Sequence, residues 1–210
     1  MGSGSPCSEA EELARELLKE LRSSMLERLR GVADETRRLL LLLAWLCTRI
    51  EVRDLGRLVV TGGFAVEVYT GRAYRTLDID VVAEGCSARV LEVFLESIGE
   101  RVARGYVPRP EYLALKSIDI VSTVYDRELP PVKLLVDEFR IYVEPPETLI
   151  ATYLAGWKFW GSTEDRDKAL LLLASMESLV DWGSLREAAR RRRVEDYLER
   201  LVELMKRVGP

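Results

Sequence analysis

The chain has 210 residues, of which 48% are hydrophobic, so it is long enough to bury the core of one domain with helical additions. Its net charge of −4 gives no overall attraction to nucleic acid or to an anionic membrane. The sequence contains no histidine, which excludes His-based triads, His metal ligands and the usual general base near neutral pH. Any catalysis must therefore rest on carboxylates, backbone amides, lysines and arginines.

Cysteine and amide usage lead to two further expectations. Cys7, Cys47 and Cys86 form no CxxC pair, which argues against a zinc site and against a disulfide framework. The sequence lacks Asn and Gln and is rich in Arg, Glu and Leu, as hyperthermophile proteins tend to be. Residues 1–8 lack the basic and apolar regions of a signal peptide, and are either a native tail or a remnant of cloning. We therefore expect a heat-adapted, cytoplasmic protein.

The N-terminal segment, residues 1–54, is predicted to be helical. An apolar stripe at helical spacing predicts a helix over residues 9–31, and a second helix follows over residues 33–49. The second helix contains the apolar run Leu39–Cys47, which is far shorter than the ~20 residues that span a bilayer. We therefore expect no membrane association. The run is either part of the core or a subunit contact, in which case the chain forms a homodimer through residues 33–49.

Residues 55–145 are predicted to form the sheet-containing core. Short β-type runs bounded by turn residues predict strands, and apolar faces at helical spacing predict the helices between them. In chain order we expect a strand at 58–61, a helix at 64–70, a strand at 77–83, a helix at 87–98, a loop at Pro108 and Pro110, a strand near 117–122, and strands at 134–136 and 139–143.

Residues 146–210 are predicted to be a C-terminal helical region. Pro145-Pro146 ends the β-structure, and helices follow at about 146–159, 164–178 and 184–207. The predicted fold class is thus α+β, with a small mixed sheet flanked by N-terminal and C-terminal helices.

Asp78 and Asp80 are the first candidates for chemistry. Side chains at i and i+2 of a strand point to the same face, so these two carboxylates project together while Ile79 points to the buried side. Two carboxylates this close repel each other unless a cation lies between them. Mg²⁺, which takes oxygen ligands from carboxylates and substrate phosphates, is the natural occupant. The alternative is a polar strand edge that faces solvent.

Gly62-Gly63 lies where a predicted strand ends and a predicted helix begins. Glycines at such a place let the backbone approach a ligand, and the helix N-terminus offers unpaired N–H groups to a phosphate. Alone, this is also a common structural turn. Together with two aligned carboxylates on the next strand, it has the parts that transfer from a metal-bound nucleoside triphosphate requires.

The stretch from Gly62 to Val81 resembles the signature of the DNA-polymerase-β-like nucleotidyltransferase superfamily. That signature is a hydrophobic residue and Gly-Gly or Gly-Ser, about a dozen residues, and then Asp-hydrophobic-Asp/Glu-hydrophobic. Arg75-Thr76-Leu77 before the aspartates resembles the form found in AbiEii-like minimal nucleotidyltransferases, which often belong to toxin–antitoxin or abortive-infection systems. The resemblance covers roughly residues 55–175 and is most specific at 62–81.

The resemblance implies the remaining site residues. The superfamily needs a third carboxylate, for which Asp119 is the candidate, since it is an isolated acid in an apolar strand. Asp78, Asp80 and Asp119 would be the catalytic residues and would hold two Mg²⁺ ions. Gly62 and Gly63 would bind the phosphates, with Arg72 and Arg75 as further neutralising groups.

The pattern departs from the family after Pro146. The expected lysine position is Tyr153, and the nearest lysine is Lys158, about 140° away around the helix, which is retained as a candidate nucleotide-binding residue. The acidic stretch 164–167 lacks the leading lysine of the family's Lys-Asp motif. It is equally an acidic helix N-terminus that complements the helix dipole.

The expected function is Mg²⁺-dependent transfer of a nucleoside monophosphate from a nucleoside triphosphate to a hydroxyl of RNA, a protein or a small molecule. The alternative, favoured by the altered lysine positions, is a non-catalytic module that binds a partner protein. The run Arg190–Arg193 is predicted to be a solvated helix face rather than an RNA-binding surface, since no aromatic residues are interleaved with it.

Overall fold

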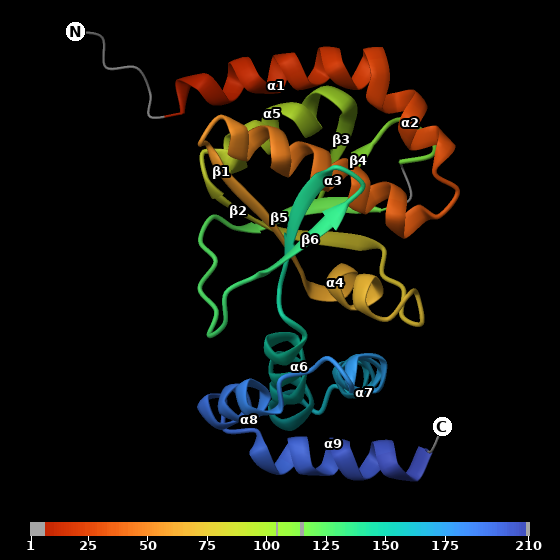
Figure 1. Ribbon diagram of the computed structural model, residues 1–210, viewed down its shortest axis with the longest axis vertical. Coiled ribbons are helices and arrows are strands. Elements are labelled where there is room, and N and C mark those ends of the chain that lie inside the picture. The colour runs from red at the N-terminus through yellow and green to blue at the C-terminus, as the bar shows by residue number, and fades with distance from the viewer. Residues whose placement is uncertain (1–6, 104, 114–115, 209–210) are drawn as a thin grey trace, which may run out of the picture. The chain divides into compact units, whose positions relative to one another are not determined.

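The computed structural model describes residues 7–103, 105–113 and 116–208 (Figure 1). Its helices are α1 (Ser8–Glu20), the π-helical turn Leu21–Met25, α2 (Leu26–Gly31), α3 (Glu35–Val52), α4 (Gly62–Tyr69), α5 (Ser87–Ile98), α6 (Pro146–Trp160), α7 (Thr163–Met176), α8 (Trp182–Arg191) and α9 (Glu195–Val208). Its strands are β1 (Gly56–Thr61), β2 (Asp78–Gly85), β3 (Gly99–Val102), β4 (Gly105–Pro108), β5 (Ser117–Ser122), β6 (Val132–Val136) and β7 (Phe139–Val143).

The chain divides by its internal contacts into two compact units. The sheet unit holds the described residues up to Thr61, together with Thr76–Tyr125 and Lys133–Val143. The helical unit holds Gly62–Arg75, Asp126–Val132 and the described residues from Glu144 onward. Helix α4 therefore groups with the C-terminal helices, although the sequence places it between two strands of the sheet.

The sheet is mixed, as predicted. Among the described residues it has seven strands in the order β3-β4-β5-β2-β1-β7-β6. β2 runs antiparallel to β1 and parallel to β5, and β1 runs parallel to β7. This arrangement, with helices before and after the sheet, confirms the α+β fold class.

Burial of apolar side chains explains the centre of the sheet unit. Ile79 and Val81 on β2 are fully buried, and so is each residue from Leu41 to Cys47 on α3. The apolar run is thus part of the chain's own core, as one of the two interpretations predicted. Burial of the run removes one reason to expect a subunit contact there, and the homodimer through residues 33–49 stays a prediction.

The prediction against disulfides was wrong, because Cys7 and Cys86 form a disulfide bond. Helix α1 packs along α5 (Figure 1), and this packing brings together cysteines that are 79 residues apart in the sequence. An ion pair between Arg89 of α5 and Glu11 of α1 joins the same two helices. Sequence spacing could not reveal the pair because it depends on the packing of two distant helices.

Two further elements differ from the sequence prediction. The helix predicted at 184–207 is broken into α8 and α9, and Arg193 lies at the break with a φ of 58°, in the left-handed region that does not continue a right-handed helix. The segment before the predicted loop contains the antiparallel pair β3 and β4, and β4 extends to Pro108, whereas Pro110 lies in a loop as predicted. These strands have only four residues each, too few for alternation to be recognised.

The helical unit is capped as the sequence chemistry suggests. Gly161, with a φ of 66°, ends α6, and the side chain of Ser162 accepts a hydrogen bond from the Asp165 amide at the start of α7. The buried Glu147 carboxylate accepts a hydrogen bond from the Asp181 amide at 2.8 Å, before α8. Of the helices described, none is both long and apolar enough to cross a membrane.

The disulfide should contribute measurably to thermal stability. Replacement Cys86→Ser removes a cross-link over 79 residues, for which loop-closure entropy predicts a loss of up to about 4 kcal/mol. We expect the melting temperature, measured by calorimetry without reductant, to fall by roughly 10 °C.

A reductant supplies the control for this experiment. It should lower the melting temperature of the native sequence but not that of the variant. Cys47 should not interfere, since burial raises the pKa of its thiol to about 12 and leaves almost no reactive thiolate at neutral pH. Equal melting temperatures for the oxidised native chain and the variant would contradict the prediction.

Candidate functional site

Three acidic side chains share one face of the central strands. Asp80 on β2 is the register partner of Asp119 on β5, and Asp78 is the partner of Ser117. Neighbouring strands lie about 4.8 Å apart, and residues paired in register point to the same face. The sheet therefore places Asp80 and Asp119 side by side, with Asp78 one step along β2 on the same face.

The row continues across β1. Thr61, the last residue of β1, is the register partner of Asp80 on the opposite side from Asp119. Thr61 is buried and is bonded directly to Gly62, where α4 begins. Gly62 has a φ of 62°, a left-handed conformation that favours glycine. The chain itself thus leads from the row of acids to the N-terminus of a helix.

The Asp119 carboxylate lies so close to Gly105 of β4 that any residue with a Cβ atom at position 105 would clash with it. A Cβ atom at Gly105 on β4 would lie 1.5 Å from the Asp119 Oδ1 atom and 2.9 Å from the Ile118 carbonyl oxygen. The same Oδ1 atom is buried and has no hydrogen-bond partner among the described residues. An unpaired buried carboxylate oxygen is costly, so it is a natural ligand for a cation or an acceptor for a substrate proton.

Asp78 is more exposed than Asp80 and Asp119, and Thr76 holds its carboxylate in place. The Thr76 hydroxyl donates a hydrogen bond to the Asp78 carboxylate, and the Asp78 amide lies 3.5 Å from the Thr76 hydroxyl oxygen. The Leu77 carbonyl accepts a hydrogen bond of 3.0 Å from the Ser117 amide. Backbone and side-chain hydrogen bonds therefore both anchor the start of β2.

The acids fit a metal ion that also takes ligands from a substrate. No cluster of three or more Asp, Glu, Cys or His side chains able to hold a metal ion is found among the described residues. The paired Asp80 and Asp119, with the orphaned Oδ1 atom of Asp119, nevertheless supply the hard oxygen donors that Mg²⁺ prefers. Mg²⁺ commonly binds one or two carboxylates and completes its shell with phosphate oxygens and water.

The other predicted site residues belong to the helical unit. Gly62 and Gly63 open α4, and Arg72 follows that helix in a left-handed conformation with a φ of 76°. Arg75 is exposed at the end of the same segment. Lys158, on α6, donates a hydrogen bond of 2.7 Å to the Arg193 carbonyl and one of 2.6 Å to the Asp196 carboxylate. Lys158 is thus held by the connection between α8 and α9.

A different lysine lies against Tyr153, the position where the family pattern expects a lysine. The Lys168 ammonium nitrogen is 5.2 Å from the ring centroids of both Tyr153 and Tyr74, and 2.9 Å from a Glu164 carboxylate oxygen. Burial opposes its charged form, but the Glu164 carboxylate and Tyr74 outweigh burial and hold the pKa of Lys168 above its ordinary value. Lys168 therefore remains a cation next to Tyr153.

The acidic stretch 164–167 and the arginine run behave as helix-surface groups. Glu164 and Asp165 lie in the first turn of α7, as the helix-dipole interpretation predicted. Arg190 and Arg191 pair with Glu187, and Arg192 pairs with Glu128. These three arginines are therefore paired with nearby acids, as is usual for charged groups on helix surfaces.

Sequence reasoning missed Gly105, Lys116 and Lys168. Lys116 ends the loop before β5, and its side chain is 1% exposed although lysine is rarely buried. A lysine directly before an apolar strand is a weak signal of such burial. Gly105 offered no signal, since its role depends on the position of Asp119 on the neighbouring strand.

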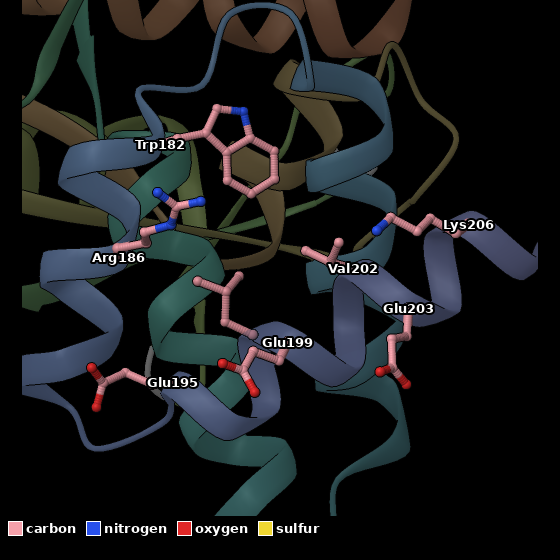
Figure 2. Close-up of a pocket in the computed structure, with 8 residues that line it drawn as sticks. Trp182, Arg186, Glu195, Glu199, Val202, Glu203 and Lys206 are labelled. Carbon is pink, nitrogen blue, oxygen red and sulfur yellow. The ribbon is translucent and has the colours of Figure 1, made fainter.

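A groove of about 700 Å³ lies between α8 and α9 (Figure 2). Trp182 and Arg186 project into it from α8, and a row of glutamates with Val202 and Lys206 lines it from α9 (Figure 2). It contains none of the residues predicted for the site. Its lining mixes both charge signs with apolar side chains, which selects no class of ligand.

The contact between Gly105 and Asp119 can be tested by adding a single methyl group. Replacement Gly105→Ala should push the Asp119 carboxylate out of the row, because the new Cβ atom would lie 1.5 Å from its Oδ1 atom. We expect Mn²⁺ affinity, measured by electron paramagnetic resonance with Mn²⁺ in place of Mg²⁺, to fall by about tenfold or more.

Replacement Gly31→Ala is the matched control, because a Cβ atom there meets no other atom within 4 Å. It should leave Mn²⁺ affinity unchanged. If both alanine variants bind Mn²⁺ as the native chain does, Asp119 takes no part in binding the ion.

By sequence, no family model matches this chain, and neither does any curated protein. By structure, it is similar to an antigenic nucleotidyltransferase-like protein from Paracoccidioides brasiliensis, with a TM-score of 0.53 and 16% identity over 81% of this chain and 93% of that one. It is also similar to the antibiotic-resistance factor ANT(2'')-Ia in solution, with a TM-score of 0.48 and 16% identity over 84% of this chain and 100% of that one. The first of these two likenesses shows that the chain has a nucleotidyltransferase-like fold.

Proposed function

We propose that this protein is a metal-dependent nucleotidyltransferase that moves a nucleoside monophosphate from a nucleoside triphosphate to a hydroxyl acceptor. The observation that carries the proposal is the in-register pairing of Asp80 with Asp119, with Asp78 on the same face. A solvated strand edge would not require the unpaired Asp119 oxygen to be buried behind a glycine. The nucleotidyltransferase-like fold supports the same class of reaction by analogy.

Each acid has a role that follows from its surroundings. Asp78, Asp80 and Asp119 would hold Mg²⁺, which when bound neutralises phosphate charge and lowers the pKa of a bound hydroxyl. Asp119, whose Oδ1 atom lacks a partner among the described residues, would accept the proton of the acceptor hydroxyl. No histidine is needed for this chemistry, in agreement with the composition.

The transfer is a displacement at the α-phosphorus. The acceptor oxygen forms a bond to that atom, the bond from the α-phosphorus to the bridging oxygen of the β-phosphate breaks, and pyrophosphate leaves with both electrons of that bond. The amides of Gly62 and Gly63 would bind the β- and γ-phosphates at the helix N-terminus. Arg72, Arg75 and Lys158 are the proposed additional cations that would neutralise the phosphate charge.

The acceptor class and biological setting are finer proposals. The Arg75-Thr76-Leu77 pattern suggests an AbiEii-like enzyme, with an RNA 3′ end or a protein hydroxyl as acceptor and a place in a toxin–antitoxin system. A small-molecule acceptor is the other candidate, and direct comparison of these three classes distinguishes them.

Transfer of label from each radiolabelled nucleoside triphosphate tests the enzyme proposal. The protein would be incubated with Mg²⁺ and with RNA, protein or small-molecule hydroxyl acceptors. The double variant Asp78→Asn/Asp80→Asn should lose activity by about a thousandfold, because metal binding supplies several kcal/mol and each ~1.4 kcal/mol is a factor of ten.

Replacement Asp54→Asn provides the control. Asp54 is an exposed acid outside the strands that carry the site, and its φ of 55° is readily adopted by Asn, so activity should not change. If the native chain transfers no more label than the double variant with any nucleotide and acceptor, the enzyme proposal is wrong. The non-catalytic partner-binding module would then be the better explanation.

A further inference from the structure

Lys116 is a buried lysine in the sheet unit that the proposed reaction does not use. Its side chain is 1% exposed, and it directly precedes β5, the strand that carries Asp119. Its ammonium group donates a hydrogen bond to the main-chain carbonyl of Thr76. It also lies 3.6 Å from a carboxylate oxygen of Glu35, in the first turn of α3.

A buried charge pair is a poor way to stabilise a fold. Removing two charges from water costs free energy that their attraction often fails to recover, and apolar replacements of such pairs are frequently neutral or stabilising. The Lys116 side chain could also have been directed to solvent, as lysine usually is. Its position therefore suggests a task other than stability.

The Thr76 carbonyl connects Lys116 to the site. Thr76 is the residue whose hydroxyl donates to the Asp78 carboxylate, so Lys116 holds the main chain of the group that orients Asp78. The residues just before it, from Gly71 to Arg75, form no helix or strand, and Leu77 just after it is 83% exposed.

We infer that Lys116 is a positioning residue that sets the orientation of the Asp78 carboxylate through Thr76, and so determines how well the acids bind a divalent cation. The ammonium group carries the effect through its hydrogen bond to the Thr76 carbonyl, while Glu35 neutralises its charge. The inference rests on the proposed role of Asp78 as a metal ligand.

Binding of Mn²⁺ alone, measured by electron paramagnetic resonance without nucleotide, tests this inference. Replacement Lys116→Met removes the ammonium group and keeps the length of the side chain. We expect the dissociation constant for Mn²⁺ to rise about tenfold or more, the effect usual for groups that orient metal ligands. Replacement Lys133→Met, at an exposed lysine of β6, should leave the constant unchanged.

A second variant separates positioning from stability. Lys116→Met alone leaves Glu35 without this partner and could unfold the chain, whereas Lys116→Met/Glu35→Gln removes both charges. The double variant should melt close to the native temperature but still bind Mn²⁺ about tenfold more weakly. Recovery of native Mn²⁺ affinity together with native stability would overturn the inference, because the pair would then be structural.

Replacement Thr76→Val tests the connecting residue. It removes the hydroxyl that donates to Asp78 and keeps the side-chain shape, so it should weaken Mn²⁺ binding by a similar factor. Adding Lys116→Met should weaken binding no further, because both changes act on the same carboxylate. Fully additive effects would show that Lys116 acts by another route.

The failure of this inference differs from failure of the proposed function. If the Asp78→Asn variant binds Mn²⁺ as tightly as the native chain does, Asp78 is not a metal ligand, and both proposals are wrong. If Asp78→Asn weakens binding but the Lys116 variants do not, only the positioning role is wrong.

Discussion

The in-register pairing of β2 with β5 is the constraint on which the candidate site depends. It places Asp80 and Asp119 on neighbouring strands, where two like charges lie close together on one face of the sheet. Such an arrangement is unfavourable unless protons, hydrogen bonds or a cation compensate for it. Thr76, Gly105 and Lys116 can each be understood as keeping these acids in place. A polar strand edge that only faces solvent would not require these three residues at their positions.

The carboxylates come from the sheet unit, whereas most of the predicted phosphate-binding groups come from the helical unit. Gly62, Gly63, Arg72, Arg75 and Lys158 all lie in the latter. Lys158 is already bound to Asp196 and a backbone carbonyl, while Lys168 lies against Tyr153. A cation next to position 153 is therefore supplied by α7 rather than by α6. This lessens the weight of the missing lysine as an argument for a non-catalytic protein.

Much of the fold could be predicted because its signals are local. The helix at Ser87–Ile98 and the strand at Ser117–Ser122 match their predicted bounds, since an apolar periodicity and flanking breakers define both. Likewise, i and i+2 spacing was sufficient to place Asp78 and Asp80 on one face. Three features could not be predicted, because each joins residues from separate elements. They are the disulfide, the close approach of Gly105 to Asp119, and the hydrogen bond from Lys116 to Thr76. The helix break at Arg193 was not predicted, because the sequence around it has no Gly or Pro to indicate a residue with a left-handed backbone conformation.

The segment Gly62–Arg75 leaves the sheet unit after Thr61 and returns to it at Thr76. Both ends of this excursion are fixed in the sheet unit, one by the pairing of Thr61 with Asp80 and the other by the hydrogen bond from Lys116 to Thr76. The helical unit is consequently discontinuous in sequence, and its first helix, α4, comes between β1 and β2 along the chain. The helical unit is not one continuous stretch of the chain, so a single truncation cannot produce it alone.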